Sequence, residues 1–296
     1  MKRTRLAVIG AVAALILGAC GDAGEEGGGG GEAAANEYEV VENPELTGAA
    51  AELAEAGEVT IGVKYDQPGI GFKGATDDVP TGFDPEMGKI IAGQLGIPAD
   101  KIEWVETISD NREPFLQKGT VDFVLASYSI TPERREIVGQ AGPYYVTGQQ
   151  LLVASDSDIK GPDDLKGKKV CSVTGSTSIA TVEKEYGAEP AGFDTYSECV
   201  DQVLSGAVDA MTTDGAILLG YAAEHPDELK VVVEPFSEER YGVGYSLDYP
   251  EMCQWIVDTL TAAQEDGTWE DAFAATLGAS GVDTPEPPAM DECPAA

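Results

Sequence analysis

Two serines and an arginine in the middle of the chain follow an apolar strand and could bind a carboxylate. Residues 121–125 read Val-Asp-Phe-Val-Leu, which predicts a buried parallel strand. Ser127 and Ser129 come just after it, and Arg134 follows a proline suited to the start of a helix. Ligands of open α/β sheets bind beyond the carboxyl ends of strands, and a guanidinium can bind a carboxylate through two hydrogen bonds. The stretch predicts a carboxylate site, although a plain strand-to-helix turn with a surface arginine would look the same.

A later stretch repeats this pattern and ends in an acidic residue. Residues 203–214 resemble residues 116–127, since both contain an aliphatic residue, a glycine and Val-Asp before a strand. Aligning the two glycines places Asp214 in register with Ser127. The repeat predicts two similar α/β lobes that face each other across a cleft, as in a clamshell. Two independent α/β domains are the plainer alternative, but they leave the polar residues at each strand end unexplained.

Cations follow two earlier strands. Lys64 and Tyr65 end a predicted strand over residues 59–63, and Ser109 and Arg112 come after the next one. They are among the polar residues that the chain carries at strand ends, where ligands of open α/β sheets bind. A solvated lysine, and an arginine paired with a neighbouring surface carboxylate, are the alternatives.

Four candidate positions have plainer interpretations. Thr177 opens a predicted helix, which is a natural anion site, but threonine is also a common cap. Asp214 would bind a cation or cap the helix that follows it. Tyr65 and Tyr128 would wall the pocket or pack in the core.

The elements that position these residues alternate between strands and helices, which predicts an α/β protein. Asp84 is predicted as the N-cap of a helix that ends at Gly96. The other predicted helices cover residues 45–56, 179–186, 216–224, 252–265 and 269–277, and a short one follows Arg112 and ends at Gly119. The other predicted strands cover residues 102–105, 149–154, 170–173, 231–233 and 241–246.

The composition excludes some partners. The chain has 296 residues, enough for two modest domains, with 18 basic and 53 acidic side chains and a net charge of -35. Binding of nucleic acid or of an anionic membrane through bulk charge is therefore excluded. The acidity is most simply a solubility feature of the surface.

The N-terminus predicts export and a lipid anchor. A basic start and a short apolar run end in Leu17-Gly18-Ala19-Cys20, which resembles the bacterial lipobox. Cleavage there would leave Cys20 to carry the lipid, with palmitate among its acyl chains, and more than one chain gives stable anchoring. An ordinary signal peptide with an incidental cysteine is the alternative. The Gly- and Glu-rich stretch after it predicts a flexible tether.

Four more cysteines, an even number in an exported chain, predict disulfides. Four cysteines allow three pairings; Cys171 and Cys199 share the second lobe, so we pair them, which leaves Cys253 with Cys293. A zinc site is the alternative, but the sequence has no CxxC spacing, and its one histidine, His225, is expected on a surface turn. No Ser/His/Asp arrangement or P-loop stands out, so we expect no enzyme, no metal and no cofactor.

With these motifs in view, the chain resembles solute-binding protein family 3, the amino-acid-binding proteins of ABC importers, and most of all the actinobacterial glutamate-binding lipoproteins. The resemblance covers residues 58–281. The motifs that carry it are Gly82-Phe83-Asp84, Gly119-x-Val121-Asp122, residues 127–134, Gly142-Pro143-Tyr144-Tyr145, Gly175-Ser176-Thr177-Ser178, Thr213-Asp214 and Tyr241-Gly242-Val243.

The resemblance implies a two-lobed periplasmic-binding-protein clamshell of type II, in which each lobe is a mixed sheet flanked by helices. It implies that Arg134 binds the α-carboxylate of an amino acid, helped by Ser129 and by the backbone amides of Ser127 and Thr177. Asp214 would bind the α-ammonium group.

In relatives that prefer acidic amino acids, cations at the positions of Lys64 and Arg112 meet the side-chain carboxylate, near Ser109. Glutamate is therefore the favoured ligand, with aspartate or glutamine possible. An ABC permease with its ATPase is the expected partner, and the protein is expected to be a monomer on the extracytoplasmic face of the cell membrane.

The expected organisation is a leader over residues 1–19 and a lipidated, tethered segment over 20–56. Residues 57–148 and 241–281 would form the first lobe, residues 149–240 the second, and residues 282–296 a proline-rich tail. Two other functions would suit the same fold: an enzyme such as a cyclohexadienyl dehydratase, or a ligand-sensing module.

Overall fold

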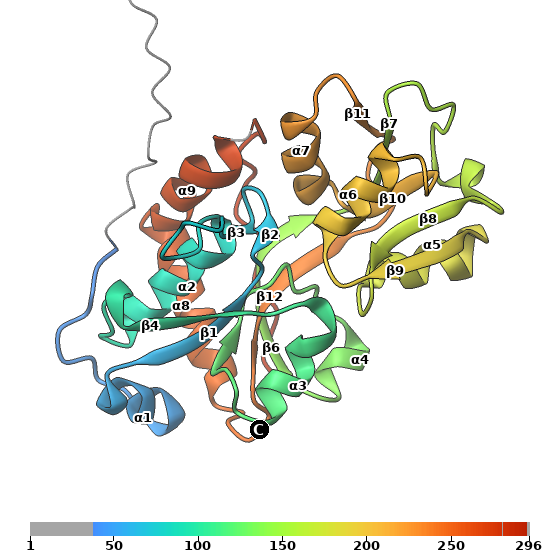
Figure 1. Cartoon of the computed structure of the whole chain (residues 1–296). Coiled ribbons are helices and arrows are strands. Elements are labelled where there is room, and N and C mark those ends of the chain that lie inside the picture. The colour runs from blue at the N-terminus through green and yellow to red at the C-terminus, as the bar shows by residue number, and fades with distance from the viewer. Residues whose placement is uncertain (1–37, 280, 295–296) are drawn as a thin grey trace, which may run out of the picture. The chain divides into compact units, whose positions relative to one another are not determined.

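The computed structural model describes residues 38–279 and 281–294. The predicted leader, Cys20 and the first part of the tether lie outside these residues. Within the described part, two five-stranded mixed sheets carry most of the helices (Figure 1). No helix in this part is long and apolar enough to cross a membrane.

The first sheet has the strand order β4-β1-β5-β12-β6. Its members are β1 (Val59–Val63), β4 (Ile102–Glu106), β5 (Phe123–Val124), β6 (Gly139–Thr147) and β12 (Glu239–Tyr245). β1 runs parallel to β4 and β5, whereas β12 is antiparallel to β5 and β6. The predicted strand over 121–125 is thus shorter in the structure, but it lies buried beside β1 as a parallel strand, as expected.

The second sheet has the order β11-β7-β10-β8-β9. It contains β7 (Gln149–Ala154), β8 (Lys169–Val173), β9 (Glu189–Phe193), β10 (Ala210–Asp214) and β11 (Leu229–Val232). The repeat seen in the sequence is visible here, because β5 and β10 each pair in parallel with another strand of their own sheet. A separate hairpin is formed by β2 (Asp66–Gln67) and β3 (Gly71–Phe72).

The helices are α1 (Gly48–Ala56), α2 (Phe83–Gln94), α3 (Arg112–Gln117), α4 (Pro132–Arg135), α5 (Thr177–Tyr186), α6 (Tyr196–Leu204), α7 (Gly215–Glu224), α8 (Met252–Glu265) and α9 (Thr268–Phe273). Short 3₁₀ turns cover Ala99–Lys101, Ser109–Asn111 and Pro162–Leu165, and a π turn covers Ala274–Gly278. Helices α2, α8 and α9 pack on one another, while α5, α6 and α7 pack on the second sheet. The sequence predicts all of the longer helices except α6, whose capping box, Thr195 with Glu198, was overlooked.

The chain crosses between the sheets twice, once between β6 and β7 and once between β11 and β12. Gly148 lies in the first crossing, where a Cβ atom would come within 2.3 Å of the Ser237 carbonyl oxygen in the second. Only glycine allows the two crossing segments to approach so closely. The sheets therefore change at 148 and again between 232 and 239; the exact lobe boundaries remain a prediction.

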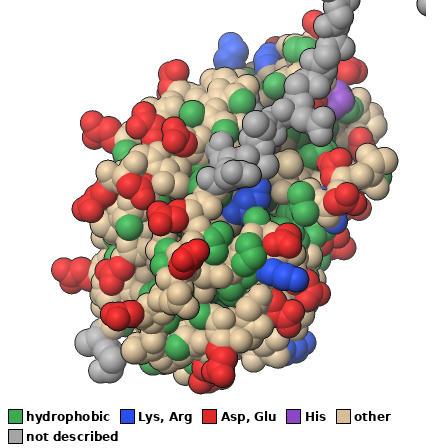
Figure 2. Space-filling view, turned by 90° about the vertical axis from the view of Figure 1, so that its left-hand side faces the viewer, with side chains coloured by type: hydrophobic (Ala, Val, Ile, Leu, Met, Phe, Trp, Pro, Cys, Tyr) green, Lys and Arg blue, Asp and Glu red, His purple; other side chains and the backbone are tan. Residues whose placement is uncertain are grey.

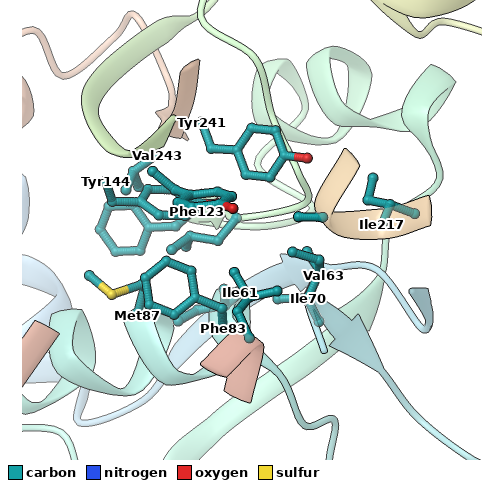
Figure 3. Close-up of a cluster of buried hydrophobic side chains, with 14 of the residues drawn as sticks. Ile61, Val63, Ile70, Phe83, Met87, Phe123, Tyr144, Ile217, Tyr241 and Val243 are labelled. Atoms are coloured by element: carbon teal, nitrogen blue, oxygen red, sulfur yellow. The ribbon is translucent and has the colours of Figure 1, made fainter. Parts of the chain in front are cut away.

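The buried apolar core extends from one sheet to the other. Figure 3 shows part of it: aromatic side chains around Phe83 and Met87, with Ile61, Val63 and Ile70 from the β1–β3 region. Ile217 of α7 belongs to the same cluster. The outer surface carries many Asp and Glu side chains and few cations on the face drawn in Figure 2, in agreement with the composition.

Two expectations differ from the structure at the start of the fold. The helix predicted from Asp84 begins at Phe83 with Gly82 as its N-cap, so the N-cap assignment is wrong, and the Asp84 side chain points into the core. The predicted tether ran to residue 56, but from Tyr38 onward the chain packs on α2. There the Val41 amide donates to the Gly93 carbonyl at 2.9 Å, and Tyr38 donates to Glu86.

Both expected disulfides are present, Cys171–Cys199 between β8 and α6, and Cys253–Cys293 between α8 and the tail. No group of residues that could hold a metal ion exists among the described residues. His225 ends α7 and lies 3.6 Å from the Glu228 carboxylate.

Candidate functional site

A small polar cavity of about 10 Å³ lies where the carboxyl ends of β5, β8 and β10 meet. It is lined from the first sheet by Ser109, Arg112, Ser127, Ser129 and Arg134, and from the second by Ser176, Thr177, Ser178, Tyr196 and Asp214. Because strand carboxyl ends of both sheets contribute, the cavity occupies the position where open α/β sheets bind ligands.

Arg134 is held from several sides. The Thr131 hydroxyl accepts from the Arg134 amide and caps α4. The guanidinium donates to the Ser129 carbonyl at 2.7 Å and pairs with Glu113 at 3.2 Å. It also lies 4.9 Å from the centre of the Tyr128 ring, over which a cation is favoured. These contacts fix the direction in which the guanidinium points.

Arg112 is 2 % exposed, so the alternative of a surface arginine paired with a neighbouring carboxylate is wrong. Its guanidinium donates to the carbonyls of Ser109, Ala126 and Ser127, each at 3.2 Å, and lies 4.6 Å from the Tyr128 ring centre. Burial, and next the nearby charge of Arg134, lower the pKa of Arg112 to about 10. Arg112 therefore stays charged at neutral pH.

One carbonyl from the second sheet reaches both arginines. The Gly175 oxygen, in the turn between β8 and α5, accepts from Arg112 at 3.2 Å and from Arg134 at 3.0 Å. The two guanidinium groups therefore converge on a single acceptor from across the cavity. Carboxylates are the ligand groups that would suit these two donors best.

Lys64 is buried behind this wall and is not a solvated lysine. Its ammonium group donates to the Ser109 hydroxyl at 2.9 Å, and Ser109 itself lines the cavity. Burial, with the charge of Arg112 second, lowers the pKa of Lys64 to about 7. Lys64 thus touches the cavity wall through Ser109.

Asp84 shapes the turn that carries Ser127. Ser127 has a positive φ of 43°, a conformation that few non-glycine residues adopt. The Asp84 carboxylate accepts from the Ser127 amide at 2.7 Å and from the Tyr144 hydroxyl at 2.6 Å. Burial raises the pKa of Asp84 to about 7, against the opposing effect of these hydrogen bonds. Sequence reasoning missed this role because the two residues are far apart in the chain.

Asp214 presents an unused acceptor. It follows the buried strand β10 and occupies the N-cap position of α7, but its side chain makes no capping bond, so the capping interpretation is wrong. The Tyr241 hydroxyl donates to Oδ2 at 2.6 Å, while Oδ1 is buried with no hydrogen-bond partner among the described residues. Buried carboxylate oxygens without partners are rare in folded proteins.

Burial raises the pKa of Asp214 to about 7, and the second cause is the charge of Glu239. Glu239 is itself buried and accepts from the hydroxyls of Thr177 and Ser237, each at 3.1 Å. Asp214 in the cavity wall and Glu239 at the start of β12 therefore form two buried carboxylates whose charges affect each other. A positively charged ligand group would be stabilised there.

The start of α5 supplies the other hydroxyls. Ser176 is its N-cap and accepts from the Ile179 amide at 3.2 Å, so Thr177 is the first helical residue. The cavity thus opens on the N-terminus of a ten-residue helix, where backbone amides favour an anion.

The structure brings together seven predicted residues in the cavity wall: Ser109, Arg112, Ser127, Ser129, Arg134, Thr177 and Asp214. Lys64 and Tyr128 are buried directly behind it. Tyr65 does not line the cavity, because its hydroxyl donates to the Trp104 carbonyl and Lys73 lies over its ring.

Three lining residues were missed: Ser176, Ser178 and Tyr196. The two serines were visible in the Gly175–Ser178 motif beside Thr177. Tyr196 was missed because it opens α6, whose capping box, Thr195 with Glu198, was overlooked.

The chain matches, over residues 59–278, the family model of bacterial extracellular solute-binding proteins, family 3. The chain belongs to this family. One similar member is the glutamate-binding protein GluB of Corynebacterium efficiens, which is 39% identical over 93% of this chain and 91% of the relative. Another is the ABC transporter glutamine-binding protein GlnH of Bacillus subtilis, 32% identical over 90% of this chain and 94% of the relative.

Among solved structures, an ancestral arginine-binding protein bound to glutamine is similar, with a TM-score of 0.70 and 35% identity. The match covers 75% of this chain and 98% of that protein. The predicted family and the two-lobed type II fold are thereby confirmed.

Proposed function

We propose that this family member binds an amino acid, with L-glutamate preferred, between its two sheets and delivers it to the permease of an ABC importer. The proposal rests on one observation. The same cavity is lined by Arg134, with its guanidinium group, and by Asp214, one of whose buried carboxylate oxygens has no hydrogen-bond partner among the described residues. A zwitterion needs one fixed anion and one fixed cation near each other, and each would otherwise be costly to bury.

Each end of the ligand has a partner in this proposal. Asp214 binds the α-ammonium group. Arg134 binds the α-carboxylate, supported by Ser129 and by the amides of Ser127 and Thr177. The two main partners come from different sheets, so both contacts form only when the sheets close on the ligand.

Lys64, Ser109 and Arg112 favour an acidic side chain. A second carboxylate brings a further negative charge into a strongly acidic protein, which is tolerable only beside buried cations. The name of the Corynebacterium relative supports glutamate, while that of the Bacillus relative supports glutamine, and the two cations favour glutamate.

The size of the cavity implies motion during binding. A volume of about 10 Å³ has room for about one water molecule and none for an amino acid. The sheets must therefore move apart to admit the ligand and close again to hold it, and the closed form would dock on the permease. Anchoring through a lipid on Cys20, at the outer face of the cell membrane, and a monomeric state complete the proposal.

Catalysis is not part of this proposal. In the cavity wall, Arg112 and Arg134 are held by backbone carbonyls, and Asp214 keeps one buried carboxylate oxygen that a ligand ammonium group could bind. Turnover of arogenate or prephenate by the purified protein would support the dehydratase alternative instead.

Calorimetric titration of the ligand-stripped protein with L-glutamate, L-glutamine, L-aspartate and L-arginine tests the proposal. We expect tight binding of glutamate and weaker binding of glutamine. Equal or tighter binding of glutamine would retain the binding role and remove the assigned role of the two cations. Binding of none of the four would overturn the proposed function.

Two substitutions separate the roles of the arginines. Arg134→Ala is expected to abolish detectable binding of every amino acid, because loss of a buried charge partner costs about 2–5 kcal/mol. Arg112→Ala is expected to weaken glutamate and aspartate selectively. Lys168→Ala, which removes a cation from an exposed ion pair with Asp209, is the control and should leave the affinity for every amino acid unchanged. If Arg112→Ala lowered the affinity for neutral amino acids as much as that for glutamate, the assignment of Arg112 to the ligand's side-chain carboxylate would be contradicted.

A further inference from the structure

The tail over residues 283–294 lies outside the cavity but is bound to the segment that carries Arg134. We propose that Asp291 in this tail is a positioning residue, which holds α4 and the residues before it so that Arg134 meets the ligand carboxylate in a fixed geometry. The inference rests on the proposed function, in which Arg134 binds that carboxylate.

The tail is fixed in place although it contains no helix or strand in its described part. Cys293 is joined to Cys253 of α8 by a disulfide. The Pro288 carbonyl accepts from the Gln264 side chain at 3.0 Å, and the Asp291 amide donates to the Gly142 carbonyl at 2.7 Å. Asp291 is thereby held against β6 with its own backbone ordered, so that its carboxylate points to a defined place.

The carboxylate of Asp291 binds two arginines at once. Oδ2 accepts from Arg135 of α4 at 2.8 Å, and Oδ1 accepts from Arg240 of β12. Burial alone would raise the pKa of Asp291, but the hydrogen bonds from Arg240 and Arg135 lower it below its usual value. A carboxylate that joins two ordered guanidinium groups contributes more than an isolated surface pair, because geometry and charge act together.

Both arginines lead to the peptide segment that precedes α4. The Arg240 carbonyl accepts from the Ile130 amide at 2.7 Å. Arg135 donates to the Gln140 carbonyl at 3.3 Å. The side chain of the same Gln140 accepts from the Thr131 amide and donates to the Ser129 carbonyl, each at 3.1 Å.

The last link reaches the binding residue itself. The Ser129 carbonyl that Gln140 holds is also the acceptor for the Arg134 guanidinium at 2.7 Å. Arg135, the direct partner of Asp291, is the residue after Arg134 in the one-turn helix α4. A helix of four residues has little rigidity of its own, so its orientation depends on such outside contacts.

The experiment compares three variants of the full chain with the wild type. Asp291→Asn removes the charge and keeps the shape, and Asp291→Glu keeps the charge. Glu238→Gln is the matched control, because Glu238 also pairs with Arg240, at 4.0 Å, but is exposed and has no bond to Arg135. Two quantities are measured. The first is the Kd for L-glutamate and for L-glutamine. The second is the NMR signal of the Arg134 Nε–H group in the ligand-free protein, which is assigned by its absence in Arg134→Lys.

We expect Asp291→Asn to raise the Kd of both ligands by the same factor, roughly three- to thirty-fold, because both ligands carry the α-carboxylate. It should also shift or broaden the Arg134 signal. Asp291→Glu should restore much of the affinity and the signal, and Glu238→Gln should change neither quantity.

Unchanged affinity in Asp291→Asn would overturn the inference. A weakened affinity with an unmoved Arg134 signal would also overturn it, since the tail would then act through stability alone. If the wild type bound no amino acid, the proposed function would fail, while the ligand-free Arg134 signal would still decide whether Asp291 positions this side chain.

Discussion

At the scale of single residues, burial brings the pKa values of an acidic and a basic group at the cavity toward each other. The pKa of Lys64 is lowered to about 7, and that of Asp214 is raised to about 7. In both cases desolvation is the largest cause, and a like charge, Arg112 or Glu239, adds to it. Both groups therefore change charge near neutral pH; Asp214 lines the cavity, and Lys64 reaches its wall through Ser109.

A pH dependence with two limbs follows for glutamate. Above about pH 7 Lys64 loses its positive charge, so glutamate affinity should fall as the pH rises. Below about pH 7 Asp214 becomes protonated and loses its charge for the ammonium group, so affinity should fall as the pH drops. Asp84, whose pKa is also raised to about 7, acts in the same direction as Asp214. Calorimetry at about pH 5.5, 7 and 8.5 checks both limbs.

Glutamine provides the comparison for this prediction. It lacks the second carboxylate, so its affinity should show the acidic limb and no alkaline one. Lys64→Met, which keeps an unbranched buried side chain, should remove the alkaline limb for glutamate. An alkaline limb that persists in Lys64→Met would mean that another group is responsible.

At the scale of elements, α2 and the turn between β5 and α4 act as a unit through Asp84. Both hydrogen-bond neighbours of the Asp84 carboxylate are donors, the Ser127 amide and the Tyr144 hydroxyl. Asp84→Ala leaves both donors buried without a partner and should lower the free energy of unfolding by about 2–4 kcal/mol. Urea denaturation at about pH 8, where the carboxylate is ionised, measures this loss.

Tyr144→Phe is the matched variant, because it removes one donor and leaves the Ser127 contact in place. We expect it to cost about 1 kcal/mol. If both variants lost the same stability, the contact with Ser127 would contribute nothing. Asp84→Ala should also weaken ligand binding, since the left-handed turn at Ser127 loses its support.

At the scale of the whole molecule, further contacts join the β2–β3 hairpin to the helices that pack on the second sheet. The Asp66 carboxylate of β2 accepts from the amide of Tyr196, the first residue of α6, at 2.7 Å. The Tyr221 hydroxyl of α7 donates to the Asp66 carbonyl. Ile217 of α7 packs in one cluster with Val63 and Ile70 (Figure 3). These contacts favour the closed arrangement without touching a ligand.

Asp66→Ala should therefore lower the affinity for every ligand by a similar factor, about tenfold, chiefly because each ligand dissociates faster. Stopped-flow measurement of the dissociation rates checks this. Asp77→Ala is the control, because Asp77 accepts from the Gly74 amide within an exposed loop. A change confined to one ligand, or one in the association rate alone, would contradict a role in closure.

Local sequence was enough for the fold class, the repeated units and most of the residues that line the cavity. Strands with β-branched residues, helix caps and polar residues at strand ends are encoded over a few neighbouring positions, and they place Ser127, Arg134, Thr177 and Asp214 at one edge of each sheet. The even set of four cysteines and the lobe assignments predicted both disulfides correctly.

Tertiary structure decided the features that depend on residues distant in the chain. The sequence left open whether Arg112 binds a ligand or pairs on the surface, and the fold decides it by surrounding Arg112 with the backbone carbonyls of Ala126, Ser127 and Gly175. Asp84 looks like a cap, yet it supports Ser127, and the proline-rich tail brings Asp291 to α4. The reason is physical: burial and hydrogen-bond partners belong to the packed chain, and no local pattern specifies which distant donor meets a given acceptor.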